Sequence, residues 1–384
     1  MRICHVTPHL PPDQAANALL PYHLGQWWVR EGHEVSYVAH PPRARHGARL
    51  PATYIRPRGA RPGWMRRTRI ASLAAAWSIL RDAGPVLDRA DLVHVHGNGL
   101  LAEVAGLLAV RRGKPVVLTL YGTEIWHYQR RAGAIDLFTR LYRAAGRVTF
   151  YSQGLLDRAR ELGLDRDGLS VVYPPVSDDF RFRDAAAQAG LRESLQVRGE
   201  HLLVNVKRVH PLAGQRYLVE AMPAIVAAHP GTHLVVCGTG PLLDELRALA
   251  HALGVDRHVR FAGLVDNAVV ASYCAAADVF VLPSLLEACP TVAVEALAAG
   301  TPVVSADHPG GVELHALFGD DVRVVPREQP APLAAAIVEG LARKRRTRPA
   351  TADVIAREFR PPVVAGRFHR VYERAIEARR GAAA

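Results

Sequence analysis

The stretch VFVLPSLLEACPTVAVEALAAGTPVVSADHPGG, at residues 279–311, contains the unit from which the fold of this chain can be predicted. An apolar run, Val279–Leu282, precedes a polar turn, a segment with helical spacing and a second apolar run, Pro302–Ser305. This order predicts a strand, a helix and a strand. Pro290 suits the first helical position, where its missing N–H costs nothing, and Gly300 suits the end of the helix.

The same alternation extends over most of the chain in both directions. Further strands are expected at Arg2–Thr7, Val35–Ala39, Leu92–His96, Pro115–Leu120, Arg147–Tyr151, Leu169–Val172, Leu202–Val206, His233–Cys237, Val259–Ala262 and Val322–Val325. Helices are expected between them, for example over Ala15–Arg30 and Gly214–Ala228. This pattern predicts an α/β fold of parallel sheets covered on both faces, in which ligands bind at the carboxyl ends of the strands.

A polar segment at 177–200 separates two α/β halves of similar size, and we interpret it as a linker. We therefore predict a Rossmann-like N-terminal domain at 1–180 and a second one at 181–362, facing a central cleft. The segment 363–384 follows Pro361 and Pro362 and predicts an amphipathic helix that packs back on the first domain.

Composition excludes several classes of protein. The 384 residues include 49% hydrophobic and 22% charged ones, which is typical of a globular protein. No run reaches the roughly 18 to 20 apolar residues of a membrane helix, and no signal-peptide pattern opens the chain, so we expect a cytoplasmic protein that does not associate with a membrane. The four cysteines form no metal-binding or disulfide pattern.

The net charge of +12 permits an anionic partner. The densest basic run, Arg343–Arg348, contains no aromatic residue, so no nucleic-acid partner is expected. We interpret this run as a solvated helix end.

Residues 287–295 carry the candidate chemistry. The amides of Thr291 and Val292 would lack intrahelical acceptors at the positive end of the helix dipole, which suits a diphosphate. Glu287 and Glu295 flank this helix start. Carboxylates repel phosphates but accept hydrogen bonds from neighbouring sugar hydroxyls, as expected of a nucleotide-sugar site. A surface and a capping glutamate would be the purely structural alternative.

Glu287 and Glu295 form an E-x7-E motif within P-S-x-x-E…E-A-x-A-x-G-x-P-V-V, and this resembles the retaining GT-B glycosyltransferases of the family 4 type. Further segments resemble the family in the same order: GHEV at Gly32–Val35, LTLYGTE at Leu118–Glu124, CGTGP at Cys237–Pro241, AGLVDN at Ala262–Asn267 and YCAAADVFVLPS at Tyr273–Ser284.

The resemblance implies a nucleotide-sugar donor on the second domain and an acceptor on the first. By resemblance, Glu295 would hold the ribose and Glu287 the transferred sugar. Arg208 would neutralise the leaving diphosphate, whose charge grows as the bond breaks. Donor contacts are also expected at Gly238 and Ala16 on the corresponding loops, at the amides of Thr291 and Val292, and at Lys207 beside Arg208. Such enzymes retain anomeric configuration and usually need no divalent metal, so neither metal nor cofactor is expected.

The sequence departs from the family pattern at several positions. Ala213 stands where a lysine is expected after Arg208, and Lys207 is a candidate to compensate, although on a regular strand it would face the other side. The loop Asp13–Asn17 replaces a Gly-Gly pair. Tyr121 replaces a histidine that contacts the donor sugar in the family, and Ala288–Thr291 replaces a Gly-Phe-Gly-Leu type run.

Three segments, at 5–27, 206–215 and 287–302, resemble actinomycete aminoglycoside-antibiotic glycosyltransferases. This implies a UDP-sugar donor, with N-acetylglucosamine, glucose or a related sugar, and a 2-deoxystreptamine-type aminocyclitol or pseudodisaccharide acceptor. Such a polycation needs carboxylates, for which Asp13 and Glu124 are our candidates, with Tyr121 and Asn17 beside them.

Alternatives remain. A glycosyltransferase of the same family could act on another small-molecule, lipid or polysaccharide acceptor. A nucleotide-sugar epimerase would share the architecture, but no acid–base set as specific as E-x7-E is present. His94 and His96 could share one face of a strand, but no third ligand is within sequence reach, so no zinc site is expected.

Overall fold

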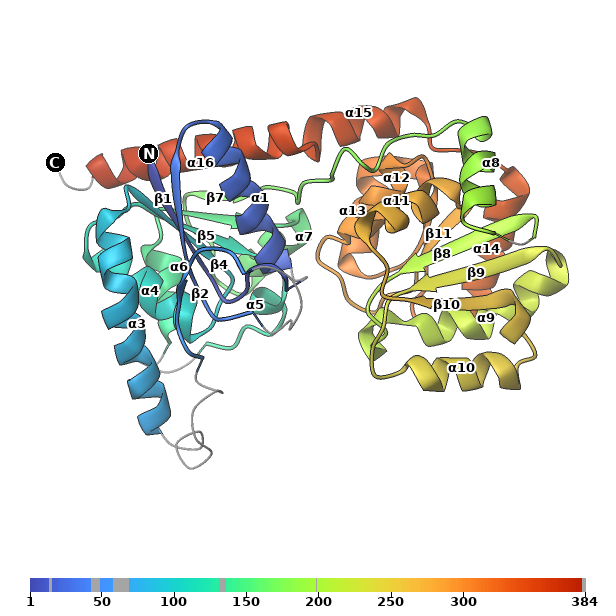
Figure 1. Cartoon of the computed structure of the whole chain (residues 1–384), viewed down its shortest axis with the longest axis horizontal. Coiled ribbons are helices and arrows are strands. Elements are labelled where there is room, and N and C mark those ends of the chain that lie inside the picture. Colours follow the sequence, from blue (N-terminus) through green and yellow to red (C-terminus); the bar gives the residue numbers. More distant parts are fainter. Residues whose placement is uncertain (14–15, 43–48, 58–68, 131–135, 198, 382–384) are drawn as a thin grey trace. The chain divides into compact units, whose positions relative to one another are not determined.

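A computed structural model describes residues 1–13, 16–42, 49–57, 69–130, 136–197 and 199–381. Gln14 and Ala15, part of the loop singled out above, lie outside the described residues. The chain forms two compact units, coloured along the sequence in Figure 1. Unit 1 contains Met1–Tyr173 and Val364–Ala384, and unit 2 contains Pro174–Val363. The division therefore falls seven residues before the sequence-based boundary at 180.

Unit 1 contains a parallel sheet of seven strands among its described residues, in the order β3-β2-β1-β4-β5-β6-β7. The strands are β1 (Arg2–Thr7), β2 (Glu34–Ala39), β3 (Thr53–Tyr54), β4 (Leu92–His96), β5 (Val116–Leu120), β6 (Arg147–Phe150) and β7 (Leu169–Val171). The helices are α1 (Ala16–Arg30), α3 (Arg69–Arg89), α4 (Leu100–Arg111), α5 (Thr123–Trp126), α6 (Leu137–Ala144), α7 (Gln153–Glu161) and most of α16 (Pro361–Gly381). The central strands are buried along their whole length, as sheets covered on both faces are.

The C-terminal helix α16 packs on the sheet of unit 1. Phe368 and Tyr372 are fully buried, and their rings lie 5.3 and 5.5 Å from the ring of His94 on β4. Tyr372 also contacts Trp28 of α1, with the ring centroids 5.4 Å apart. The last segment of the chain thus completes the core of the first unit.

Unit 2 contains a second parallel sheet, in the order β10-β9-β8-β11-β12-β13. The strands are β8 (His201–Val206), β9 (Thr232–Cys237), β10 (Val259–Gly263), β11 (Val279–Leu282), β12 (Val303–Ala306) and β13 (Val322–Val325). The helices are α8 (Ala185–Ser194), α9 (Gln215–Ala228), α10 (Leu243–Ala252), α11 (Asn267–Ala276), α12 (Thr291–Ala298), α13 (Pro309–Phe318), α14 (Pro330–Arg343) and α15 (Pro349–Glu358), with short 3₁₀ turns η3 (Pro211–Ala213), η4 (Asp256–His258) and η5 (Gly319–Asp321). The predicted α/β fold with two Rossmann-like sheets is confirmed.

The polar segment at 177–200 is not a plain linker, so that interpretation is wrong. It contains α8, which is capped by the Asp184 side chain and belongs to unit 2. Gln188 and Arg192 of this helix donate hydrogen bonds to the carbonyls of Ala276 and Ala277 at 2.9 to 3.1 Å. A helix with a polar surface can pack through side-chain hydrogen bonds to carbonyls, and hydrophobic periodicity does not reveal such contacts.

The basic run Arg343–Arg348 is also not simply a solvated helix end. Arg346 donates to the carbonyls of Ala275, Ala277 and Ala299 and to the Thr301 hydroxyl, at 2.7 to 3.1 Å. Burial lowers the pKa of Arg346 to about 10. None of the helices in the described ranges is long and apolar enough to cross a bilayer.

Candidate active site

The strand order of each sheet reverses at one point. In unit 2 the chain moves outward from β8 to β9 on one side and to β11 on the other. Loops that leave the carboxyl ends of two such strands diverge and create a ligand site at the switch point. The loop after β8 carries Lys207 and Arg208, and the loop after β11 carries Glu287. Residues 80 positions apart are therefore adjacent because of the topology.

Lys207 and Glu287 form an ion pair across this switch point, with side chains 30% and 14% exposed. The chain holds the Glu287 loop in place through two hydrogen bonds. The amide of Leu285 donates to the Leu212 carbonyl at 2.9 Å, and the Arg327 guanidinium donates to the Leu285 carbonyl at 3.1 Å. Lys207 therefore lies beside one predicted site residue, although regular strand geometry would have turned it away.

The family pattern expects an arginine and, five residues later, a lysine; this chain has Arg208 and Ala213 at these positions. Arg208 is exposed, and no ion pair joins it to another described residue. Ala213 is 2% exposed at the end of η3, inside a turn that packs against the loop after β11. Of the two cations on the loop after β8, Lys207 is paired, and Arg208 is available for an anion.

The helix that follows the Glu287 loop begins at Thr291, one residue later than predicted. Pro290 is the capping residue, with φ −77° and ψ 86°, because its backbone is not yet helical. The first amide to find a helical acceptor is that of Ala293, which donates to the Pro290 carbonyl at 2.9 Å. The amides of Thr291 and Val292 lack an intrahelical partner, as every helix start must. Gly300 ends the helix with φ +94°, which confirms its predicted role.

Glu295 lies on the first turns of α12 and is partly exposed. No hydrogen bond or ion pair joins its carboxylate to another side chain in the described ranges. Burial raises the pKa of Glu295 to about 7. A half-buried carboxylate without a partner can accept hydrogen bonds from a ligand, which is a second property, besides spacing, that sets this residue apart.

Glycines allow the surrounding loops to approach closely. A Cβ atom at Gly238, whose φ is +141°, would lie 2.0 Å from the Lys207 carbonyl oxygen. At Gly310, on α13, it would lie 2.7 Å from the Ala288 carbonyl oxygen. The Gly310 amide also donates to the Glu287 carbonyl at 3.0 Å. Both glycines therefore keep the backbone beside the Lys207–Glu287 pair in place.

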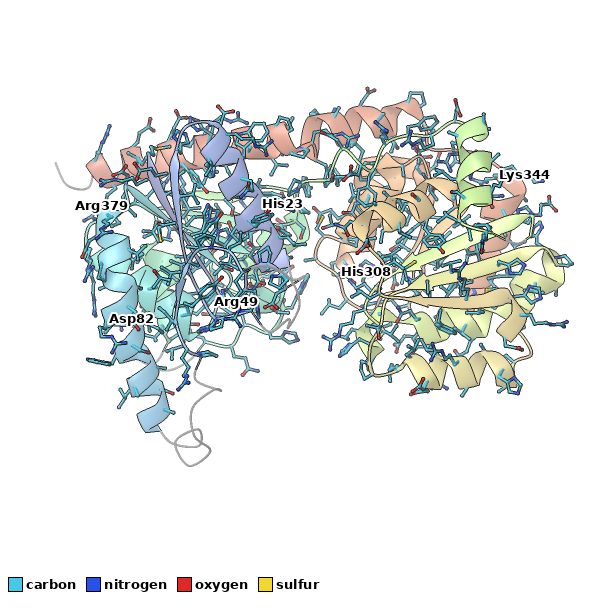
Figure 2. All side chains as sticks on the ribbon, in the orientation of Figure 1. His23, Arg49, Asp82, His308, Lys344 and Arg379 are labelled. Atoms are coloured by element: carbon cyan, nitrogen blue, oxygen red, sulfur yellow. The ribbon has the colours of Figure 1, made fainter. Side chains whose placement is uncertain are left out.

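His308, labelled in Figure 2, was not singled out by the sequence analysis. It precedes α13, and its Nδ1 accepts a hydrogen bond from the Gly311 amide at 2.9 Å. Burial lowers the pKa of His308 to about 3, and Lys207 is one of the nearby charges. The neutral ring caps the helix next to the site. The signal in the sequence was the polar residue directly before Pro309-Gly310.

In unit 1 the predicted acceptor residues gather at the carboxyl ends of β1, β4 and β5. Glu124 is 5% exposed, and its Oε2 accepts hydrogen bonds from the amides of Tyr121 and Gly122 at 3.2 and 2.8 Å. A Cβ atom built at Gly97 would lie 3.0 Å from the Glu124 Oε1 and 3.7 Å from the Asn17 Nδ2. Burial raises the pKa of Glu124, while these backbone hydrogen bonds oppose the shift.

Asp13 and Ala16 lie on the segment that follows β1. The Asp13 Oδ2 is 3.2 Å from the His9 Nδ1, and the Asp13 side chain is 11% exposed. Ala16 is exposed as the first residue of α1. The structure thus brings Glu124, Tyr121 and Asn17 together, whereas the Asp13 carboxylate contacts His9.

The fold brings to His94 and His96 a third histidine that lies far from them in sequence. His5 of β1 lies opposite His94 in the parallel register, and side-chain nitrogens of the three buried histidines lie within 4.8 Å of one another. The Tyr121 hydroxyl is 2.8 Å from the His96 Nδ1. Sequence distance concealed this cluster, but the adjacency of β1 and β4 in a Rossmann-like sheet could have predicted it.

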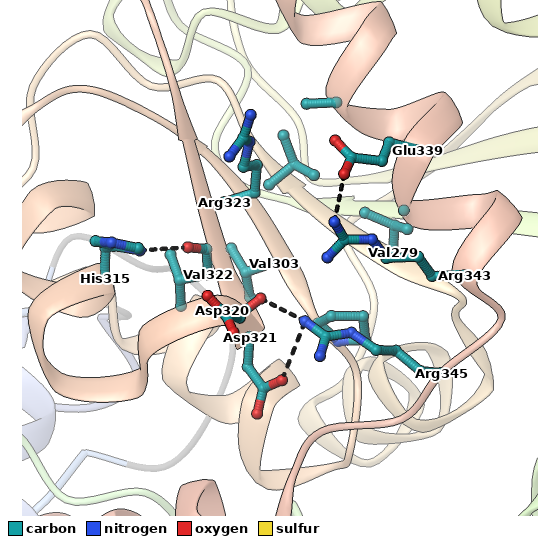
Figure 3. A pocket seen from close by; sticks show the side chains of 14 residues that line it. Val279, Val303, His315, Asp320, Asp321, Val322, Arg323, Glu339, Arg343 and Arg345 are labelled. Carbon is teal, nitrogen blue, oxygen red and sulfur yellow. Dashed lines mark hydrogen bonds and ion pairs between the residues drawn. The ribbon is translucent and has the colours of Figure 1, made fainter.

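A separate cavity of about 210 Å³ lies in unit 2, away from the residues above (Figure 3). Val279, Val303 and Val322, the first residues of β11, β12 and β13, line it. Two of its arginines face acidic groups: Arg343 pairs with Glu339, and Arg345 lies 3.5 Å from Asp321. It therefore marks the amino ends of the strands, opposite the edge where ligands of parallel sheets bind.

Comparisons with known proteins agree with this geometry. A family model described as "Glycosyl transferases group 1" matches residues 189–351, and one described as "Glycosyltransferase Family 4" matches residues 21–180. The phosphatidyl-myo-inositol mannosyltransferase of Mycobacterium tuberculosis is 32% identical over 290 residues, which cover 74% of this chain and 73% of that protein. The fold and site thus define a GT-B glycosyltransferase, and the chain belongs to the family 4, or group 1, glycosyltransferases.

The chain is also similar to two further proteins. The GDP-mannose-dependent alpha-(1-6)-phosphatidylinositol monomannoside mannosyltransferase of Mycobacterium tuberculosis is 34% identical over 223 residues. That match spans only 56% of each protein, so the chain corresponds to about half the length of this relative. Anabaena Alr3699/HepE, solved in complex with UDP and glucose, superposes with a TM-score of 0.73 at 18% identity, covering 96% of this chain and 98% of that one.

Proposed function

We propose that this glycosyltransferase moves a sugar from a UDP-sugar to a 2-deoxystreptamine-type aminocyclitol or pseudodisaccharide, with retention of anomeric configuration. The observation that carries the donor half is the grouping of Glu295, the Lys207–Glu287 pair and the unpaired helix amides at one switch point. Each part matches one part of a nucleotide sugar.

The diphosphate would lie at the amides of Thr291 and Val292, with Arg208 as its free cation. Glu295 would accept hydrogen bonds from the ribose hydroxyls, and Glu287 from those of the transferred sugar. The bond from the sugar C1 to the β-phosphate oxygen breaks, and C1 bonds to the acceptor oxygen. The acceptor proton passes to the leaving phosphate. Amides and cations already aimed at this phosphate stabilise its growing charge, so we propose that no metal is required.

The choice of UDP as the donor nucleotide rests on resemblance, so UDP-sugars must be compared with GDP-sugars. Anabaena HepE was solved with UDP and glucose, whereas the similar mycobacterial protein is named as GDP-mannose-dependent. The test must therefore offer both nucleotides. Gly238 would lie beside the base or ribose, since its loop contacts the Lys207 backbone.

The acceptor half of the proposal rests on unit 1. Glu124 and Asn17 lie around Gly97 at the carboxyl edge, with Asp13 and Ala16 on the segment after β1. A buried carboxylate that keeps one oxygen toward this space suits an ammonium group of an aminocyclitol. We expect Glu124→Gln to raise the acceptor KM more than the donor KM. If only the donor KM rises, Glu124 does not bind the acceptor.

Mass spectrometry tests the proposal. The protein is incubated with EDTA and with UDP-N-acetylglucosamine, UDP-glucose, UDP-xylose or GDP-mannose, each with 2-deoxystreptamine or paromamine. A product heavier by one sugar supports transfer and identifies both substrates. Slow hydrolysis of a nucleotide sugar without transfer would contradict the aminocyclitol acceptor but support the donor site. If no nucleotide sugar is bound or consumed, the donor assignment is wrong.

One observation favours a lipid acceptor as a second candidate. Leu73, Trp77 and Leu80 of α3 are 70%, 61% and 41% exposed, and their spacing places them on one face of the helix. Exposed apolar helix faces of this kind bind the interfacial region of bilayers. Two similar mycobacterial proteins are named for phosphatidylinositol substrates. Transfer of mannose to phosphatidylinositol in vesicles, together with vesicle binding that Trp77→Ser abolishes, would favour this candidate over the aminocyclitol.

A further inference from the structure

The three buried histidines of unit 1 form hydrogen bonds through five of their six ring nitrogens. The His94 Nδ1 is 2.7 Å from the Tyr372 hydroxyl, and its Nε2 is 2.6 Å from the Thr119 hydroxyl. His94 therefore links β4 to α16 and β5 and has no nitrogen left for another ligand. These two hydrogen bonds satisfy the buried His94 ring, which does not belong to the candidate site.

His96 connects the cluster to the site. Its Nε2 is 2.9 Å from the His5 Nδ1, and its Nδ1 is 2.8 Å from the Tyr121 hydroxyl. The remaining nitrogen, the His5 Nε2, is buried and has no hydrogen-bond partner among the described residues. A bound metal would have to displace these contacts, so the cluster is better explained as a directed hydrogen-bond network.

The direction of this network follows from counting protons. Burial lowers the pKa of His5 to about 3 and that of His96 well below its usual value, so both rings are neutral. A neutral imidazole has one N–H donor and one acceptor nitrogen. Because only the Nδ1 of His5 has a partner, a proton on its Nε2 would leave an N–H group buried without an acceptor. Buried N–H groups without an acceptor are rare, whereas a buried ring nitrogen whose lone pair has no donor is tolerated better.

The His5 proton therefore lies on Nδ1 and is donated to the His96 Nε2. His96 must then carry its own proton on Nδ1 and donate it to the Tyr121 oxygen. The Tyr121 O–H group consequently points away from His96. It is directed to Tyr151, with which Tyr121 forms a side-chain hydrogen bond and whose ring lies 4.5 Å from that of Tyr121. Both tyrosines follow the carboxyl ends of their strands, β5 and β6.

We propose that His96, held by His5, is a positioning residue that fixes the Tyr121 hydroxyl as a hydrogen-bond donor, to Tyr151 without substrate and to an acceptor atom of the substrate when it is bound. This subsite would take an acceptor atom, such as a sugar hydroxyl oxygen, while an ammonium group would be directed to Glu124. The functional part of this inference rests on the proposed function, because it assumes that Tyr121 faces a sugar substrate.

The tautomers can be measured without any activity. In the full chain labelled with ¹⁵N-histidine, long-range ¹H–¹⁵N spectra distinguish Nδ1–H from Nε2–H rings. His5→Gln and His96→Gln variants identify the two signals by their loss. We expect both residues as neutral Nδ1–H tautomers. An Nε2–H tautomer at either residue would contradict the proposed direction of the hydrogen-bond network. So would the finding that purified protein contains one zinc ion per chain and that His5→Gln removes it.

Kinetics then test the positioning role. Asn at position 96 can place an amide donor where the histidine Nδ1 lies, whereas Gln reaches the Nε2 position instead. We expect His96→Gln to lower the kcat/KM for the acceptor about tenfold, the effect of losing one hydrogen bond, and His96→Asn to restore most of it. In a Tyr121→Phe background the two variants should be equally active, since the hydroxyl they orient is gone.

His94→Gln provides the matched control, since this equally buried histidine does not contact Tyr121. It should lower the Tm without changing the preference between acceptors. If it lowers kcat/KM as much as His96→Gln does, or if the position 96 variants still differ in the Tyr121→Phe background, the positioning role is refuted. If the wild-type chain transfers no sugar at all, the proposed function fails. The tautomer measurement still tests the direction of the hydrogen bonds from His5 to His96 and from His96 to Tyr121.

Discussion

Nucleotide binding should strengthen as pH rises through 7, and Glu295 should be the cause. Burial raises the pKa of its carboxyl from 4.5 to about 7, and only the ionised form is acceptor-only toward a ribose diol. At pH 6 roughly a tenth of the carboxyl groups are ionised, and at pH 8 roughly nine tenths. Since apparent affinity scales with the competent fraction, the UDP affinity should rise about ninefold over this range.

Calorimetric titration of UDP at pH 6, 7 and 8 measures this change. The second ionisation of the terminal phosphate also falls near pH 6, so Glu295→Gln is the necessary control. The variant should bind UDP more weakly at pH 8 and should lose the steep part of the pH dependence. A wild-type pH profile that parallels the profile of Glu295→Gln would refute the assignment of Glu295 to the ribose.

The same shift has a consequence for stability. The folded-state pKa is higher than the unfolded one, so the folded protein binds more protons between pH 4.5 and 7 and loses stability as pH rises through this window. A shift of this size corresponds to about 3 kcal/mol, an upper value because Glu295 is partly exposed. Thermal unfolding should show Glu295→Gln stabilised relative to wild type at pH 8 but not at pH 4.5. Equal Tm differences at both pH values would contradict this.

Three substitutions test other parts of the account. Lys207→Met should leave Glu287 without its cation and lower kcat by roughly 10²-fold, as measured by sugar transfer; an unchanged kcat would show that the pair has no catalytic part. Gly310→Ala places a Cβ atom 2.7 Å from the Ala288 carbonyl oxygen and should weaken UDP binding, with Gly190→Ala, which meets no atom within 4 Å, as its matched control. Arg346→Met removes four hydrogen bonds of a largely buried guanidinium and should destabilise the protein by about 3 kcal/mol in thermal unfolding. A Tm within one or two degrees of wild type would show that water replaces these bonds.

Much of the fold could be predicted from the sequence because strand and helix periods differ. The apolar runs at β1, β4, β11 and β13 were predicted with the bounds that the structure has. Glycine at position 300 marks a helix end because its φ of +94° suits few other residues. The segment at 177–200 misled the prediction because α8 packs through polar side chains rather than an apolar stripe.

The candidate site was only partly accessible from the sequence. Spacing singled out Glu287 and Glu295, but the ion pair of Glu287 with Lys207 depends on where the β8 loop turns, which strand periodicity does not predict. The partnership of His5 with His96 joins residues 91 positions apart through the order of the strands. Contacts of this kind require topology and register, not composition.

Hydrogen exchange measured by mass spectrometry, with and without UDP, tests the central claim most directly. The claim is that the carboxyl edge of unit 2 at the β8–β11 switch point holds a nucleoside diphosphate. The account predicts slower exchange in peptides covering 207–214 and 285–295, with little change at the cavity lined by Val322, Arg323 and Arg345. Protection at that cavity, with unchanged exchange at 285–295, would contradict the account.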